Sequence, residues 1–110
     1  MLGMKLYDAA GRAAYLAGFH AAQGLISEQT GRSVKTHKGV RVRFHQLTKG
    51  DPRLDAELRD FLGFAYDIKS IADYETGPGS DVSPEMAAAA IKTSKRFVAK
   101  MAELIEVPPA

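Results

Sequence analysis

Residues 9–26 read AAGRAAYLAGFHAAQGLI, and this stretch decides the fold. Alanine and glycine make up much of it, and its strongly polar side chains are Arg12, His20 and Gln23. A helix that is apolar on nearly every side must be covered by other elements, and small residues let neighbouring helices approach closely. We therefore expect a central helix that the rest of the chain covers.

Length and composition indicate one globular domain. The chain has 110 residues, of which 45% are hydrophobic and 25% charged, so residues 1–110 form a single expected domain with a tail at 107–110. The absence of cysteine excludes disulfides and thiolate metal sites. Polar residues interrupt the most apolar stretch and no export signal is evident, so we expect a cytoplasmic protein without a membrane partner.

Turn and capping residues predict where the first two helices begin and end. The first helix should begin near Tyr7 or Asp8 and end by residues 27–31, where Gly31 suits the left-handed conformation that stops helices. Thr36 should then cap a second helix by accepting an orphan amide hydrogen bond. The apolar stripe of this second helix would be Val40, Phe44 and Leu47.

Similar signals predict two further helices. Gly50 should end the second helix, Asp51 should cap the third, and Pro52 should occupy its first turn. The core side of the third helix would be Leu54, Leu58, Phe61, Ala65, Ile68 and Ala72. Ser83 and Pro84 should open a fourth helix that runs to about residue 105. Its core side would be Ala87, Ile91, Ser94, Val98, Met101 and Ile105.

These segments predict the fold class, which is all-α. We expect an antiparallel up-and-down bundle of four main helices joined by short connections. Val40 and Val42 alternate with polar residues, but that run is too short and too basic to favour a strand over the helical pattern.

Basic residues are unevenly distributed, although the net charge is only +2. No acidic residue lies between Glu28 and Asp51. That segment contains Arg32, Lys35, Lys38, Arg41, Arg43 and Lys49, together with His37 and His45. Such a segment favours a phosphate or an acidic partner, and the alternative is a solvated helix face without a ligand.

Sequence motifs for other kinds of chemistry are absent. The three histidines, His20, His37 and His45, lack the spacing of a metal site, so we expect no metal. The sequence also contains no nucleophile elbow, Walker loop or dinucleotide fingerprint, and we expect no cofactor.

The end of the third helix is a second candidate site. Tyr66, Lys69 and Asp73 follow Leu62 on one face that begins apolar and ends polar, and Tyr74 comes next. A surface ion pair between Lys69 and Asp73 is the simplest interpretation, because they are one helical turn apart. In the alternative, Lys69 and Tyr74 donate hydrogen bonds to a phosphate while Asp73 orients one of them.

Three motifs occur in order: AAYLAGFHAAQGLI, KTHKGVRVRFHQL and IADYE. Together they resemble the bacterial and archaeal branch of the HEPN family (higher eukaryotes and prokaryotes nucleotide-binding), from about residue 12 to residue 104. The resemblance implies an antiparallel helical bundle, commonly a homodimer. It also implies work on RNA or nucleotides in toxin-antitoxin, defence or stress systems, often beside a small nucleotidyltransferase.

The chain departs from the catalytic Arg-x4-6-His motif of active HEPN ribonucleases. At the equivalent position it has Lys69 and Tyr74, and we regard this motif as degenerate. Lysine lacks the bidentate fork of arginine, and tyrosine is a poor base at neutral pH, so Lys69 and Tyr74 are weak catalytic candidates. Arg32 and His37 match the spacing literally, but they precede the second helix, and we interpret this match as coincidence.

The predicted function is a module that binds RNA or nucleotide phosphates with weak or no catalysis, in a toxin-antitoxin or stress-response system. Its binding residues would be His37, Lys38, Arg41, Lys69, Asp73 and Tyr74. One alternative is a metal-independent endoribonuclease toxin in which His37 or Tyr74 replaces the missing histidine. Another is a purely structural partner of a nucleotidyltransferase. The segment before the central helix is short for the family, so we expect either a reduced bundle or a lost start. An uncovered apolar face would then favour a homodimer.

Overall fold

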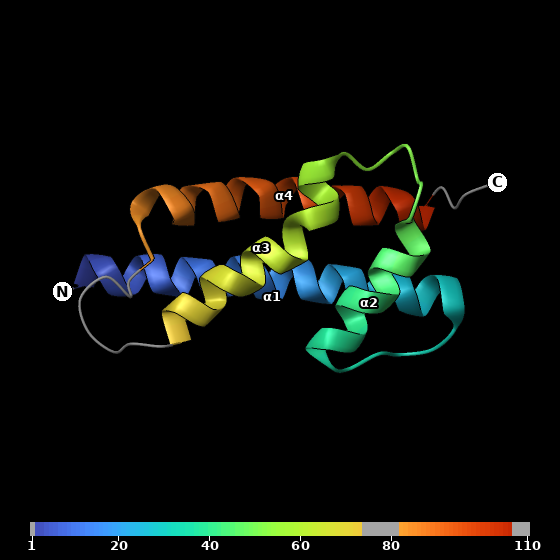
Figure 1. Ribbon diagram of the computed structural model, residues 1–110, viewed down its shortest axis with the longest axis horizontal. Coiled ribbons are helices and arrows are strands. Elements are labelled where there is room, and N and C mark those ends of the chain that lie inside the picture. Colours follow the sequence, from blue (N-terminus) through green and yellow to red (C-terminus); the bar gives the residue numbers. More distant parts are fainter. Residues whose placement is uncertain (1, 74–81, 107–110) are drawn as a thin grey trace.

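The computed structural model describes residues 2–73 and 82–106, with side chains for residues 6–72 and 82–106. Within these ranges the chain forms four α-helices and no strand: α1 (Leu2–Thr30), α2 (His37–Thr48), α3 (Ala56–Asp73) and α4 (Pro84–Glu106). In Figure 1, α3 and α4 lie against the long α1, and the shorter α2 lies near the C-terminal end of α1. The predicted all-α helical bundle is confirmed.

Helices α1 and α4 run side by side in the same direction. Near the start of both helices, the carboxylate of Asp8 accepts a hydrogen bond from the Val82 amide at 3.1 Å. Further along both, the Ser94 hydroxyl donates to the Ala14 carbonyl at 3.2 Å. The contacts therefore advance along the two helices together, as the colours of Figure 1 also show.

Helix α3 crosses α1 in the opposite direction. The Arg12 guanidinium donates to the Ala72 carbonyl at 3.0 Å, whereas Gly18, further along α1, packs against the earlier residue Phe61. A side chain at Gly18 would collide with the Phe61 ring, so this glycine permits the close approach of the two helices. Helices α1 and α4 thus run in one direction and α3 runs in the other, while α2 lies oblique to α1 and α4 (Figure 1).

The central position of α1 is as expected. Its buried side chains share one hydrophobic core cluster with aromatic residues from each of the other three helices, and they include Tyr15, Phe19, Ala22, Leu25 and Ile26. The cover is incomplete, because one arc of α1 is exposed and holds Leu6, Ala13, Ala17 and Gly24. No helix in the described ranges has the length and apolar composition needed to cross a membrane.

Several predicted boundary residues act as expected. Gly31 and Gly50 follow α1 and α2 with positive φ values of 72° and 77°. The Ser83 hydroxyl accepts a hydrogen bond from the Met86 amide at 3.1 Å and so caps α4. Glycine and serine were therefore reliable markers of helix ends.

The predicted start of α1 is wrong. The helix begins at Leu2 rather than near Tyr7 or Asp8. Asp8 is buried, and it bonds the amide of Val82 in the segment before α4 instead of capping its own helix. A residue with capping chemistry was thus recruited by a distant part of the chain.

The predicted start of α3 is also wrong. The helix begins at Ala56, and its cap is Asp55, whose carboxylate accepts from the Leu58 amide at 2.9 Å. Asp51 is held instead by the backbone and guanidinium of Arg53 in the preceding turn. The predicted core side of α3 is buried throughout: Leu54, Leu58, Phe61, Ala65, Ile68 and Ala72.

The predicted core side of α4 is partly wrong. Ile91 and Val98 are 39% and 38% exposed. Phe97 is buried instead, with ring centroids 5.3 Å from Phe44 and 4.9 Å from Phe61. Because the largest apolar side chain gains most from burial, Phe97 sets the rotation of α4. The other expected core residues that are buried are Ala87, Ser94 and Met101.

Candidate functional site

The candidate site lies at the start of α2, where this helix faces α1 and α3. Thr36 has an extended backbone (φ −83°, ψ 147°), and its hydroxyl accepts a hydrogen bond from the Gly39 amide at 3.0 Å. This confirmed cap fixes the first turn of α2, which carries the exposed side chains of His37 and Lys38. Val40 is buried behind them, so the cationic side chains are held on the outer surface.

His37 contacts two aromatic side chains of the central helix α1. The Tyr15 hydroxyl lies 2.6 Å from Nδ1 of His37, at hydrogen-bond distance. The imidazole ring also packs on Phe19, with centroids 4.7 Å apart. Tyr15 is fully buried, and burial raises the pKa of its hydroxyl above the ordinary value of 10.0, with nearby Arg41 opposing that shift. The tyrosine therefore stays protonated over the physiological range, and it orients the histidine ring.

The Tyr15–His37 hydrogen bond has two chemical consequences, depending on which group donates. When the tyrosine hydroxyl donates to Nδ1, a neutral imidazole keeps its proton on Nε2 and can donate it to a phosphate oxygen. When Nδ1 donates to the tyrosine oxygen, Nε2 is free to accept a proton. The first state suits binding, and the second suits general-base catalysis.

Arg41 lies one turn after His37 and contacts α3. Its guanidinium carbon is 4.7 Å from the centroid of the Tyr66 ring, in a cation–π arrangement. Its Nε is buried and has no hydrogen-bond partner among the described residues. The Tyr66 ring also lies 6.1 Å from the His37 ring. An arginine that stacks on an aromatic ring and is not neutralised by a carboxylate keeps its charge for a ligand.

The structure places the two halves of the sequence-predicted site differently. His37, Lys38 and Arg41 share the first two turns of α2, and the first and last of these contact Tyr66. Lys69, which is half-buried, lies one turn beyond Tyr66, about 4.5 Å further along the axis of α3.

Asp73 and Tyr74 lie at and beyond the end of α3. Asp73 is the last residue of the helix, about 10 Å along the axis from Tyr66, and its side chain is outside the described residues. Tyr74 is outside them altogether. In Figure 1, α3 leads away from the start of α2 toward the other end of the molecule. The contacts that α3 makes with the cationic turns of α2 therefore centre on Tyr66.

The sequence interpretation missed the aromatic part of the site. Tyr15 and Phe19 lie on the central helix that we expected to form the core, and Tyr66 was placed with Lys69 and Asp73, yet all three surround the His37 ring. The available signal was the hydroxyl of Tyr15 inside a helix of alanine and glycine. A buried tyrosine hydroxyl usually finds a hydrogen-bond partner, and that partner turned out to be His37.

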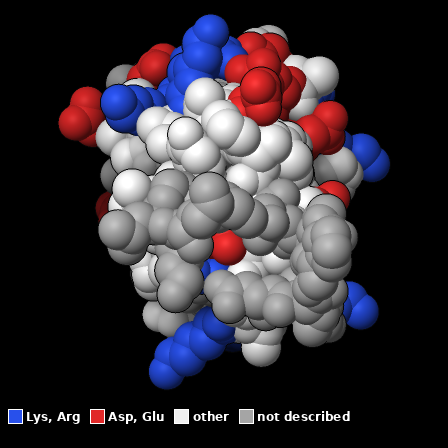
Figure 2. Space-filling model, turned by 90° about the vertical axis from the view of Figure 1, so that its left-hand side faces the viewer, with Lys and Arg blue, Asp and Glu red and all other residues white. Residues whose placement is uncertain are grey.

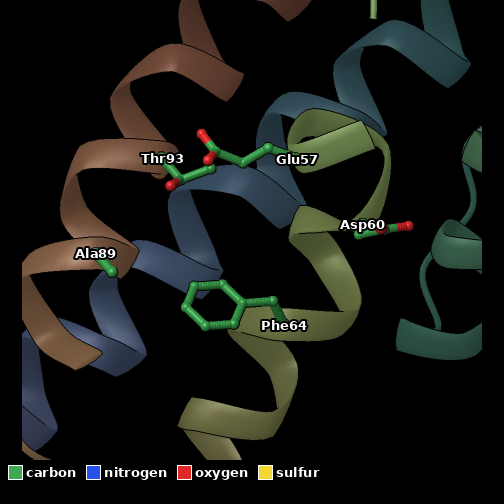
Figure 3. Close-up of a pocket in the computed structure, with 5 residues that line it drawn as sticks. All are labelled: Glu57, Asp60, Phe64, Ala89 and Thr93. Atoms are coloured by element: carbon green, nitrogen blue, oxygen red, sulfur yellow. The ribbon is translucent and has the colours of Figure 1, made fainter. Parts of the chain in front are cut away.

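A different pocket, of about 250 Å³, lies between α3 and α4. Figure 3 shows Phe64 between the two helices, with Glu57 and Thr93 at one end and Ala89 on α4. Its charged lining residues are Glu57 and Asp60, and the Asp60 side chain points away from α4. None of the described residues that line this pocket is cationic, and Glu57 is already paired with Arg96, so these residues offer no positive charge for a phosphate.

Charge is also mixed at the end of the bundle where α3 finishes and α4 begins. Figure 2 shows Lys and Arg side chains interspersed with Asp and Glu side chains around the margin of this face. The surface of α2, by contrast, combines unneutralised positive charge with aromatic side chains.

The fold and this site define a class of protein, a small all-α bundle with a cationic and aromatic surface on its shortest helix. A family model for the HEPN domain matches residues 1–104, so the chain belongs to the HEPN family, whose domains are generally nucleotide- or RNA-related. No curated protein and no solved structure gives a significant match.

Proposed function

We propose that this HEPN domain binds RNA or nucleotide phosphates through His37, Lys38 and Arg41 on α2. Lys69, Asp73 and Tyr74 would extend this surface along α3. The observation that carries the proposal is the position of Arg41, which stacks on Tyr66 and lacks a carboxylate partner among the described residues. His37, held by Tyr15, adds a directed donor within the same two turns.

The biological setting that we propose is a toxin-antitoxin or stress-response system, with weak or no catalysis. The degenerate motif at Lys69 and Tyr74 supports weak catalysis, because neither residue supplies the fork or the base of the family motif. A nucleotidyltransferase partner is an alternative role for the same fold, and it predicts partner capture without RNA binding.

A second candidate function, a metal-independent endoribonuclease, is favoured by one specific observation. The Tyr15 hydroxyl fixes the His37 ring at 2.6 Å, and Arg41 lies on the same side of α2 one turn later. Oriented imidazole next to a cation is a geometry suited to proton transfer at a phosphodiester. In this reading His37, rather than Tyr74, takes the role of the missing histidine.

End-labelled single-stranded RNA incubated with the protein in EDTA tests both functions. We expect a retarded complex with uncut RNA, and retardation should weaken in Lys38→Gln with Arg41→Gln. Shortened RNA that disappears with His37→Gln would establish the endoribonuclease instead. Cleavage that is lost only in the double variant Lys69→Ala with Tyr74→Phe would assign catalysis to the end of α3. Neither retardation nor cleavage would refute both functions.

We also propose that the protein is a homodimer that pairs through α1 and α4. The exposed arc of α1 contains Leu6, Ala13 and Ala17, and Ile91 and Val98 are exposed on α4. Ser94, midway between Ile91 and Val98, bonds the carbonyl of α1 residue 14, so the two exposed apolar surfaces adjoin. An apolar face across two helices is the usual chemistry of an interface between copies.

A further inference from the structure

A cleft of about 330 Å³ lies between α2 and α3, next to the stacked Arg41. Its inner wall is formed by the buried side chains of Phe44 and Leu62 and by the backbone of Gly63. Apart from its two chain neighbours and the backbone of its own helix, no heavy atom of the described residues lies within 4 Å of the position that a Cβ of Gly63 would occupy. The glycine therefore leaves open space beside the apolar lining residues of the cleft.

The outer edge of the cleft is mainly cationic. Arg41, His45 and Arg59 line it, with Asp60 as the acidic lining residue. Neither arginine forms an ion pair with a carboxylate in the ranges that the structure describes. Two arginines and a histidine around an apolar wall provide a phosphate-binding charge and planar groups for stacking on a base.

The size of the cleft limits its ligand. Pockets for small molecules span about 300–1,000 Å³, so this cleft, near the lower limit, admits one nucleotide rather than several. A base can enter only when it is unstacked and unpaired, as in single-stranded RNA. Asp60 also lines the cleft, and a carboxylate can accept hydrogen bonds from an amino group on the edge of a base.

We infer that the α2–α3 cleft binds one unpaired nucleotide of RNA. Its base would lie over Gly63, its phosphate at Arg41 and Arg59, and its amino group at Asp60. This inference rests on the proposed function and deepens it, because it assigns a separate nucleotide subsite beside the phosphate-binding turns of α2. Arg41 belongs to both, since it stacks on Tyr66 and lines the cleft.

Filling the cleft with a side chain tests the inference. Gly63→Leu places an isobutyl group in open space, and leucine is a better helix former than glycine, so the variant should fold at least as well. Ala89→Leu is the matched control, because it fills the pocket of Figure 3 between α3 and α4. Circular dichroism and the urea midpoint would verify that both variants are folded.

Two probes are used. Binding of cytidine 5′-monophosphate is measured by calorimetry, and binding of RNA is measured with a labelled single strand. We expect Gly63→Leu to weaken nucleotide binding at least about tenfold, the loss of one stacked base, and Ala89→Leu to match the wild type. Arg59→Gln should also weaken nucleotide binding.

The inference would be overturned if folded Gly63→Leu bound the nucleotide as tightly as the wild type does. If RNA binding then still fell in Lys38→Gln with Arg41→Gln, the proposed function would stand without the subsite. If the wild-type protein did not bind RNA at all, the proposed function itself would be rejected.

Discussion

The Tyr15 hydroxyl is the point at which the hydrophobic core and the candidate site meet. Its ring is fully buried among apolar side chains, while its oxygen lies 2.6 Å from an exposed histidine. Burial makes ionisation of this hydroxyl unfavourable, which is why its pKa is raised. One side chain thus couples the stability of the core to the orientation of His37.

Replacement of Tyr15 by phenylalanine should reveal that coupling in alkaline solution. The folded-state pKa lies above the ordinary value of 10.0, so the unfolded chain loses this proton first as pH rises. The stabilisation is complete below about pH 10 and is lost as pH rises through the folded pKa. Urea unfolding at neutral pH and above pH 10 should show a larger loss of stability in the wild type than in Tyr15→Phe.

At neutral pH the same substitution removes one hydrogen bond, and we expect a cost of about 0.5–1.5 kcal/mol. Equal alkaline losses in the two proteins would show that Tyr15 ionises as readily in the folded state as in the unfolded chain.

Single residues of the site were predictable to different degrees. The acid-free segment identified His37, Lys38 and Arg41 as candidates, because charge patterning is visible in one dimension. Tyr66 was placed on the face of the second candidate site, but its stacking with Arg41 was not predicted, because that contact depends on which helix crosses in front of it. The role of Lys69, Asp73 and Tyr74 stays a prediction.

At the scale of elements, the crossing of α1 and α3 depends on the absence of a side chain at Gly18. A Cβ at this position would collide with the ring of Phe61, which is fully buried and cannot withdraw without disrupting the core. Gly63, on α3, offers the opposite environment, since its missing Cβ would meet nothing.

This pair of glycines predicts opposite effects of the same substitution. Gly63→Ala should stabilise the protein by about 0.5–1 kcal/mol, because alanine has the higher helix propensity. Gly18→Ala gains the same propensity but overpacks the core, and we expect a net destabilisation of about 1–3 kcal/mol. Urea unfolding midpoints of the two variants measure the difference. Equal stabilisation in both would mean that α1 and α3 do not pack as closely as described.

Element boundaries were predictable where the capping group acts within its own segment. Thr36 and Ser83 bond amides of the helix that follows, and both were assigned correctly. Asp8 failed as a marker because its partner, Val82, is distant in the sequence. The prediction of which side of α4 faces the core failed for a related reason, because Phe97 packs against rings from two other helices.

At the scale of the whole molecule, the bundle leaves apolar surface on the side of α1 and α4. The proposed homodimer would bury this surface and leave the cationic turns of α2 accessible, because those turns are joined to α1 through Tyr15 and Phe19, outside the exposed arc. The fold class was predictable from apolar periodicity, whereas the assembly requires knowledge of which faces remain uncovered.

Charge placed in the proposed interface should separate the dimer. Light scattering at micromolar concentration should give twice the chain mass of 11.9 kDa for the wild type. Ala17→Glu with Val98→Glu should give the single-chain mass, since both residues are exposed and a charge there is desolvated only on pairing. Val42→Glu, at an exposed apolar residue of α2, is the control and should remain dimeric. A monomeric wild type would contradict the proposal.

The most direct measurement of the central claim is the salt dependence of RNA binding. Fluorescence anisotropy of labelled single-stranded RNA, at about 50 mM and about 200 mM salt, counts the cations that neutralise phosphates. Lys38→Gln with Arg41→Gln should lower affinity at least about tenfold and reduce the logarithmic salt slope by about 1.4, two cations at about 0.7 each. Lys92→Gln with Lys95→Gln, which changes two exposed cations on α4, should leave both quantities as in the wild type. Equal losses in the two double variants, or wild-type binding that ignores salt, would contradict the claim that α2 is the phosphate-binding surface.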